Sequence, residues 1–349
     1  MDHTLTGELY NMKKYLNLFL FLLCKWSHCQ IVEWDSLAKN NLGNYDIYFI
    51  GEQHGYNNSE IIEAKLIERI HTKNTTVLLE GPYDRNFGLN KIFINKDTSL
   101  YPFNSFNPSK TNLLRYLYYN HIPLKLTDVV LFKYFYKDEI VEVLNKKGIN
   151  NPLEDDISNF YRIGNLKFPN KKKNRNLYLN YLDTYRTKKS IYDTLLGSDS
   201  TKIEECFNAL EASINAKQDP RTGSGLWSDF RETFMCSMIV KEIKNPASSK
   251  IISINGADHC FLQNKVKGVK SGNGRGPLAY RIKSAFPDKK VCSILVWNRK
   301  EGLLFSYFPV ESRFILKNTK PGKIYIINVD YPGTPFVNLV GRFTHVVVY

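Results

Sequence analysis

Cysteine is scarce in this sequence, and its spacing excludes the common zinc-binding patterns. The chain has 6 cysteines in 349 residues, with no C-x-x-C or C-x-x-H pair, and structural zinc sites are usually built from such pairs. The cysteines after residue 29 are Cys206, Cys236, Cys260 and Cys292. Their even number permits disulfides in an oxidising compartment, but their wide separation favours buried free thiols.

Long hydrophobic runs are also absent. The most apolar stretch, residues 15–23, is too short to span a bilayer. It follows Lys13 and Lys14, and a basic segment before a short apolar run is the layout of a secretory signal. An apolar first helix of the fold is the alternative.

The expected signal also has a cleavage point. Ser27 and Cys29 place small residues at positions −3 and −1 of a cut that leaves Gln30 as the new N-terminus. Residues 1–11 add nothing to a signal, which favours Met12 as the true start. We therefore expect an exported protein, periplasmic or secreted, with no transmembrane anchor after cleavage. Lipid modification of a cysteine in residues 24–29 is a further alternative.

Acidic residues are outnumbered by basic ones, 34 to 48, and the net charge is +14. Such a charge attracts phosphate only where it is clustered. The lysines are scattered between acids, and the one compact run, residues 171–175, is interpreted as a solvated loop. We expect no nucleic-acid partner. Hydrophobic residues at 43% and charged residues at 23% fit a chain with a sizeable core and exclude disorder.

Phosphate-binding glycine motifs are missing. Residues 271–276 are rich in glycine but lack both a preceding strand and the Lys-Ser/Thr ending of a P-loop. This excludes the Walker A and dinucleotide-binding motifs and predicts a flexible rim loop.

Hydrophobic patterning predicts an α/β fold with a mostly parallel central sheet flanked by helices. Strands alternate with helices in the first half, and the parallel sheet follows from the crossover connections. The expected strands are residues 46–50, 76–80, 122–127 and 251–255, and the helices between the first three are 58–71 and 111–120.

A large all-helical insertion interrupts this alternation at about residues 135–220. We expect residues 30–349 to form a single domain, in which the sheet resumes after the insertion and gains extra C-terminal strands. The expected helices are 138–147, 175–196, 201–216, 225–244 and 277–285, and the later strands are 291–297, 303–308, 323–329 and 344–348.

Polar residues follow each of the first four predicted strands. Ligands of open parallel sheets bind at the carboxyl ends of the strands, so these residues are expected to share one crevice. They are Glu52 with His54, Glu80, Asp128, and Asp258 with His259.

His54 is the strongest candidate for a catalytic base. It lies in a glycine-flanked turn with Glu52 and Glu80 available to orient its ring and raise its basicity. Such a histidine can take a proton from water or from a hydroxyl group. Alternatively, His54 only caps the following helix.

Arg231, Glu80 and His259 have both functional and structural interpretations. An arginine directed at the sheet from helix 225–244 needs a carboxylate or a developing negative charge as partner, whereas a solvent-facing one does not. Glu80 acts in the site or caps a helix. His259 is a second acid or base, a metal ligand, or a core histidine with satisfied hydrogen bonds.

The order of these motifs resembles the erythromycin esterase-like proteins and their relatives in the ChaN/Tiki superfamily. The resemblance spans nearly the whole chain after residue 46. It is carried by the motifs at residues 50–55 (IGEQHG), 79–81 (LEG), 231–235 (RETFM) and 255–259 (NGADH). Two departures stand out: the esterases commonly have an additional residue before the first histidine, and aspartate is usual where this chain has Glu232.

The resemblance implies an exported hydrolase that adds water to an ester or lactone of a small molecule without a cofactor. It implies His54 as general base, Glu52 and Glu80 as orienting or acid groups, Arg231 as electrostatic support and His259 as second site histidine. Asp128 and Asp258 are expected to bind substrate.

Other branches of the superfamily imply other chemistries. The ChaN branch implies a haem-binding envelope protein, and the Tiki branch implies a peptidase dependent on a divalent metal. Haem binding would depend on His54 or His259, and a bound metal would take Glu52, His54, Glu80 and His259 as ligands. A pocket that has lost its chemistry is the remaining alternative.

Overall fold

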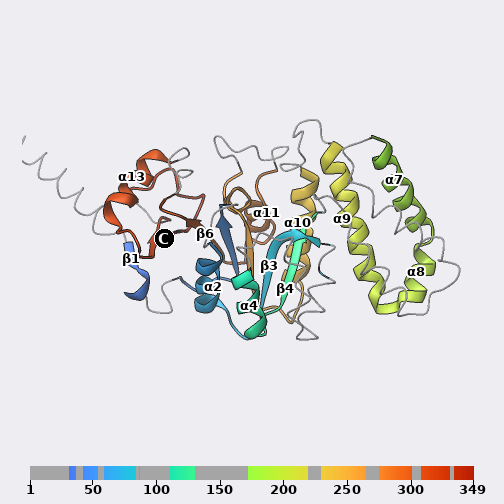
Figure 1. Cartoon of the computed structure of the whole chain (residues 1–349), viewed down its shortest axis with the longest axis horizontal. Helices are drawn as coiled ribbons and strands as arrows, with labels where there is room; N and C mark the ends of the chain where they lie inside the picture. Colours follow the sequence, from blue (N-terminus) through green and yellow to red (C-terminus); the bar gives the residue numbers. More distant parts are fainter. Residues whose placement is uncertain are drawn as a thin grey trace, which may run out of the picture.

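The structure of the chain is a computed structural model (Figure 1). It describes residues 31–36, 42–53, 59–83, 86, 111–129, 172–218, 229–264, 275–300, 308–330 and 334–349. The predicted signal, His54, helix 138–147, most of the glycine-rich loop and nearly all of strand 303–308 lie outside these residues.

The fold is α/β, as predicted, and its centre is a mostly parallel sheet of eight strands. The strand order is β1-β7-β8-β6-β2-β5-β3-β4, and only β7 runs antiparallel to its neighbours. The strands are β1 (Ile31–Glu33), β2 (Ile47–Glu52), β3 (Thr75–Pro82), β4 (Leu124–Asp128), β5 (Lys250–Gly256), β6 (Val291–Trp297), β7 (Tyr325–Asn328) and β8 (His345–Val348).

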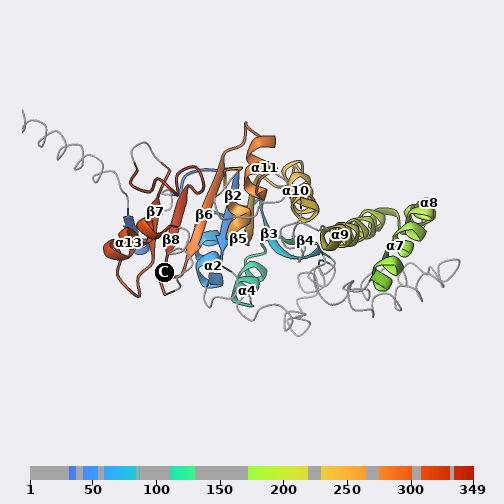
Figure 2. The same cartoon turned by 90° about the horizontal axis from the view of Figure 1, so that it is seen from above.

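Helices cover both faces of the sheet because the central strands are apolar on both sides. On β2, Tyr48 and Ile50 pack with α2 and α4, while Ile47 and Phe49 pack on the opposite face with α10, α11 and α13. Figure 2 shows these two helical layers on either side of the strands. The helices are α2 (Ser59–Ile70), α4 (Thr111–Tyr119), α10 (Asp229–Ile243), α11 (Leu278–Ala285) and α13 (Pro309–Asn318).

The described part of the insertion is helical, as expected. It extends from the sheet beyond β4, at the right of Figure 2, and has an aromatic core of its own in which Tyr185 stacks on Phe207 at 3.8 Å. Its elements are α7 (Lys172–Thr187), α8 (Lys189–Leu196), η6 (Gly197–Asp199) and α9 (Ser200–Gln218).

Several local predictions were wrong. The basic run predicted as a loop forms the first turn of α7 from Lys172, since lysine and arginine are good helix formers. The predicted helix 175–196 is two helices with a break at Lys188. Helix α13 was missed, although Pro309 at its start and Lys317 in its last turn are ordinary helix signals.

Strand β1 was also missed. It is only three residues long and exists through its antiparallel pairing with β7. Among the described residues, no helix is long and apolar enough to cross a membrane.

Candidate functional site

The four predicted polar positions come together because their strands are neighbours. Strands β2, β5, β3 and β4 are consecutive in the sheet and parallel, so their carboxyl ends lie on one edge. Glu52 and Asp128 are the last residues of β2 and β4, and Glu80 lies near the end of β3. His259 lies in η7 (Ala257–Cys260), directly after β5.

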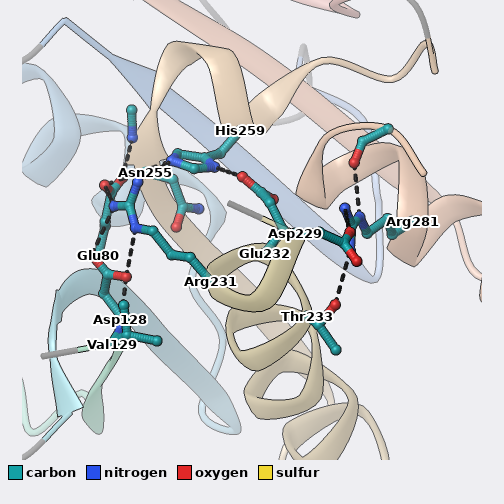
Figure 3. A network of polar contacts seen from close by, with 12 residues as sticks. Glu80, Asp128, Val129, Asp229, Arg231, Glu232, Thr233, Asn255, His259 and Arg281 are labelled. Atoms are coloured by element: carbon teal, nitrogen blue, oxygen red, sulfur yellow. Dashed lines mark hydrogen bonds and ion pairs between the residues drawn. The ribbon is translucent and has the colours of Figure 1, made fainter. Parts of the chain in front are cut away.

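Arg231 is the centre of the site and enters it from the first turn of α10 (Figure 3). Its Nε donates to Asp128 Oδ1 at 2.8 Å and its Nη2 to Asp128 Oδ2 at 2.7 Å. Nη2 also forms an ion pair with Glu80 Oε1. The side chain of Arg231 is only 5% exposed, so these two carboxylates supply the compensation that a buried guanidinium requires.

Glu80 joins three elements through its two oxygens. Oε1 accepts from Arg231, and Oε2 accepts from the backbone N–H of Gly256, at the end of β5, at 2.6 Å. The β3–β4 register shifts between Leu79 and Pro82, and an irregularity of this kind redirects side chains at a strand end. The carboxylate is thereby held between α10 and β5.

His259 is held from both sides of its ring. Nδ1 forms an ion pair with Glu232 Oε1, while Nε2 lies 3.2 Å from Arg231 Nη1 and 3.7 Å from Glu80 Oε1. Since arginine can only donate, Nε2 accepts in the neutral ring and the proton is on Nδ1, facing Glu232. A protonated ring can instead donate from Nε2 toward Glu80.

The ring of His259 is fully buried, which on its own lowers the pKa of an imidazole. The carboxylates of Glu232 and Glu80 outweigh that burial and the repulsion by Arg231, and raise the pKa of His259 above its usual value of 6.5. For Arg231, burial likewise acts to lower the pKa, but Asp128 and Glu80 raise it further, so the guanidinium stays charged.

A second cluster fixes the start of α10, which carries Arg231 and Glu232 (Figure 3). Arg281 of α11 donates to Asp229 Oδ1 at 2.6 Å, to Thr233 Oγ1 at 3.2 Å and to the carbonyl of Gly276 at 2.7 Å. These contacts attach α11 to the first turn of α10.

Gly51 allows the close packing of β2 against η7. A Cβ atom at this position would lie 3.1 Å from Ala257 Cα and 3.2 Å from the Cβ of Cys260. The glycine of the predicted first motif is therefore required by the approach of the turn that carries His259.

The remaining predicted residues are placed less centrally. Glu52 is buried and accepts from Ser59 Oγ at 3.3 Å, which ties it to the start of α2. Asp258 is half-buried in η7. Asp128, predicted to bind substrate, has both oxygens engaged with Arg231, and Oδ1 also accepts from the N–H of Val129 at 2.7 Å. His54 lies outside the described residues.

Sequence reasoning assigned no role to Glu232. Its contact with Nδ1 of His259 joins residues that lie on different elements, and no local motif encodes that contact. The one signal was its position next to Arg231 on an apolar helix, where a carboxylate needs a buried partner.

The described side chains of the site do not form a metal centre. Among the described residues, no group of three or more His, Cys, Asp or Glu side chains has the arrangement of a metal site. The guanidinium of Arg231 takes the position of a cation between Glu80 and Asp128. The described donor set therefore does not fit a metal.

Two solved structures share this architecture. A mutant of the erythromycin esterase EreC in its open conformation has a TM-score of 0.57 at 12% identity, over 88% of this chain and 91% of that chain. A succinoglycan biosynthesis protein has a TM-score of 0.61 at 10% identity, over 94% of this chain and 95% of that chain. No family model and no curated protein matches the sequence. The chain thus shares the fold of these two proteins.

Proposed function

We propose that the protein is an exported hydrolase that adds water to an ester or lactone of a small molecule. The supporting observation is the contact set of His259. Glu232 binds Nδ1, and Nε2 faces the Arg231–Glu80 ion pair at the carboxyl edge of the sheet. This arrangement fixes the ring and its tautomer, as an acid–base group requires.

In the proposed reaction, His54 removes a proton from water while the water oxygen attacks the carbonyl carbon. The carbon–oxygen bond of the ester then breaks, and protonated His259 gives its proton to the leaving alkoxide. The products are a carboxylic acid and an alcohol, or a hydroxy acid from a lactone. A pKa raised above 6.5 suits His259 to the acid role near neutral pH.

The carboxylates and Arg231 are assigned supporting roles. Glu52 and Glu80 orient the histidines, and Arg231 stabilises Glu80 and Asp128 by charge. These groups act by preorganisation, because they fix the geometry of the catalytic residues before the reaction begins. Asp258 is proposed to contact substrate.

A panel of p-nitrophenyl esters and macrocyclic lactones tests the proposal, with product formation followed by absorbance and mass spectrometry. His54→Ala should reduce turnover by about 100-fold or more, the usual contribution of a general base. His121→Asn is a matched control, because His121 is exposed with φ of 53°, a backbone conformation that asparagine tolerates.

Three results would overturn the proposal. The first is unchanged turnover in a folded His54→Ala variant. The second is loss of activity with EDTA, which would favour the metal-dependent peptidase. The third is a Soret band that depends on His54 or His259, which would favour the haem-binding protein.

A further inference from the structure

A cavity of about 200 Å³ lies beside the edge strand β4, between it and helices α9 and α10. Its described lining comes from β3, β4, the segment after β3 and the two helices. None of the site residues Glu80, Asp128, Arg231, Glu232 and His259 lines it. The cavity is therefore separate from the candidate site.

One part of the lining is apolar. Leu78, Leu124, Met238 and the ring of Tyr83 contribute to it. A dry cavity of about 150 Å³ lined by apolar side chains accommodates benzene. The volume is thus sufficient for one ring or short branched chain together with a small polar group.

The acidic groups of the lining already accept hydrogen bonds on both of their oxygens. Glu205 accepts from the Tyr83 hydroxyl on one oxygen and from Lys241 on the other. Glu242 accepts from Lys125 on Oε1, and from Asn245 and Ser248 at 3.3 Å each on Oε2. Neither carboxylate needs a hydrogen bond from a ligand.

The basic groups of the lining have donors to spare. An ammonium group has three N–H donors. Lys125 and Lys241 each bind one carboxylate oxygen, and Lys202 binds Asp199 Oδ1 at 3.0 Å. The three lysines are thus balanced by three carboxylates, and what they offer a ligand is their remaining N–H donors.

We propose that this cavity is a binding site for a compact monocarboxylate whose apolar body is the size of one ring. The apolar side chains take the body, and the lysine ammonium groups bind the carboxylate. The spare N–H donors of the lysines favour a ligand group that accepts hydrogen bonds. A single negative charge disturbs this charge-balanced lining less than a phosphate dianion does.

The probes are 4-fluorobenzoate, its neutral analogue 4-fluorobenzamide, and phenyl phosphate, titrated into the purified protein and followed by NMR. The benzoate should bind more tightly than both others. Its affinity should fall as salt rises, since the lysines are about half exposed and their charges are screened.

Two variants test the location. Lys202→Gln should weaken benzoate binding by about two- to fivefold, the contribution of a half-exposed charge contact. It leaves Glu205 and Glu242 with their partners. Met238→Trp should abolish binding by filling the cavity. Lys244→Gln is the matched control, because Lys244 is exposed one turn beyond Lys241 and does not line the cavity.

Equal binding of benzoate and benzamide would overturn the proposal, because charge would then have no part in recognition. Tighter binding of phenyl phosphate would overturn the monocarboxylate assignment in favour of a phosphate monoester. Unchanged benzoate binding in a Met238→Trp variant with native circular dichroism would place the site elsewhere. The binding assay does not depend on the hydrolase proposal, which is tested by turnover.

Discussion

Arg231 and Asp128, 103 positions apart in sequence, form a two-point ion pair in which Nε and Nη2 each donate to one carboxylate oxygen. Both side chains are 5% exposed. The pair joins the first turn of α10 to the end of the edge strand β4. The ion pair thereby connects α10, which follows the helical insertion, to the sheet. It also fixes the helix turn that carries Glu232.

Arg231→Lys should destabilise the fold strongly. A lysine keeps the positive charge but cannot reproduce the planar two-point geometry, so at least one buried carboxylate oxygen loses its donor, at a cost of about 1–3 kcal/mol. The free energy of unfolding from chemical denaturation measures the effect. Arg186→Lys is the control, since Arg186 is half exposed on α7 and should change stability by less than about 1 kcal/mol. Similar values for the two variants would contradict this prediction.

Glu232→Gln should lower the pKa of His259. The substitution removes the carboxylate charge that raises this pKa and keeps an oxygen able to accept from Nδ1. NMR titration of the imidazole ring measures the shift, with Glu204→Gln on the surface of α9 as control. If His259 is the acid of the reaction, the alkaline limb of the pH–rate profile should move to lower pH in the same variant. An unchanged ring pKa would contradict the role given to Glu232.

The same histidine should make the free energy of unfolding depend on pH above about 6.5. Its folded-state pKa is raised, so the stabilisation is complete below the unfolded value of about 6.5 and is lost as the pH rises through the folded-state pKa. Denaturation curves at a series of pH values measure this loss, which should be smaller in Glu232→Gln. If the free energy of unfolding varies with pH equally in the wild type and in Glu232→Gln, the pH dependence belongs to other groups.

His345 should have the opposite effect at acid pH. Burial lowers the pKa of His345 to about 4. Stability is therefore complete above about 6.5 and is lost by up to about 3 kcal/mol as the pH falls to the folded-state pKa. Denaturation curves between pH 4 and pH 7 measure this loss of stability. In His345→Asn, the free energy of unfolding should depend less on pH over this range. A pH dependence that His345→Asn leaves unchanged would contradict this prediction.

Gly51→Ala should reduce stability by about 1–3 kcal/mol through overpacking. The new methyl group would lie 3.1 Å from Ala257 Cα, so η7 must move. Because η7 carries His259, turnover should fall by more than the loss of folded protein explains. Gly322→Ala is a control that measures the cost of a positive φ without overpacking. Gly322 has φ of 76°, and no atom lies within 4 Å of the added methyl group. Full specific activity in a folded Gly51→Ala protein would contradict the positional role.

The four described thiols should resist alkylation in the native protein. Cys206, Cys260 and Cys292 are buried and Cys236 is partly buried, all as free cysteines. Burial raises the pKa of Cys236 and Cys260 and brings that of Cys292 to about 12, so little reactive thiolate is present. Mass spectrometry after iodoacetamide treatment should find Cys236 as the first of these four to react. Rapid labelling of Cys292 without denaturant would contradict this.

The local pattern of the sequence was enough to predict the central strands and their flanking helices. β2, β5 and β6 are continuous apolar runs, and α2 has apolar residues at helical spacing, so burial and secondary structure agree. Of the missed elements, β1 depended on context, because it is held by pairing with β7. The basic start of α7 lacks an apolar pattern of its own, although its lysines are good helix formers. The expectation of free, buried cysteines was confirmed for three of the four, and Cys236 is partly exposed.

By itself, the sequence determined which side chains stand at the ends of the parallel strands, because strand period and chain direction are local properties. Only the tertiary structure decided which of them touch. Arg231 pairs with Asp128 and Glu80, and Glu232 pairs with His259. These pairs form because strand order places β5, β3 and β4 side by side and the first turn of α10 lies above their ends. A buried charge must find its partner within a few ångströms, and that distance is set by packing between elements far apart in the chain.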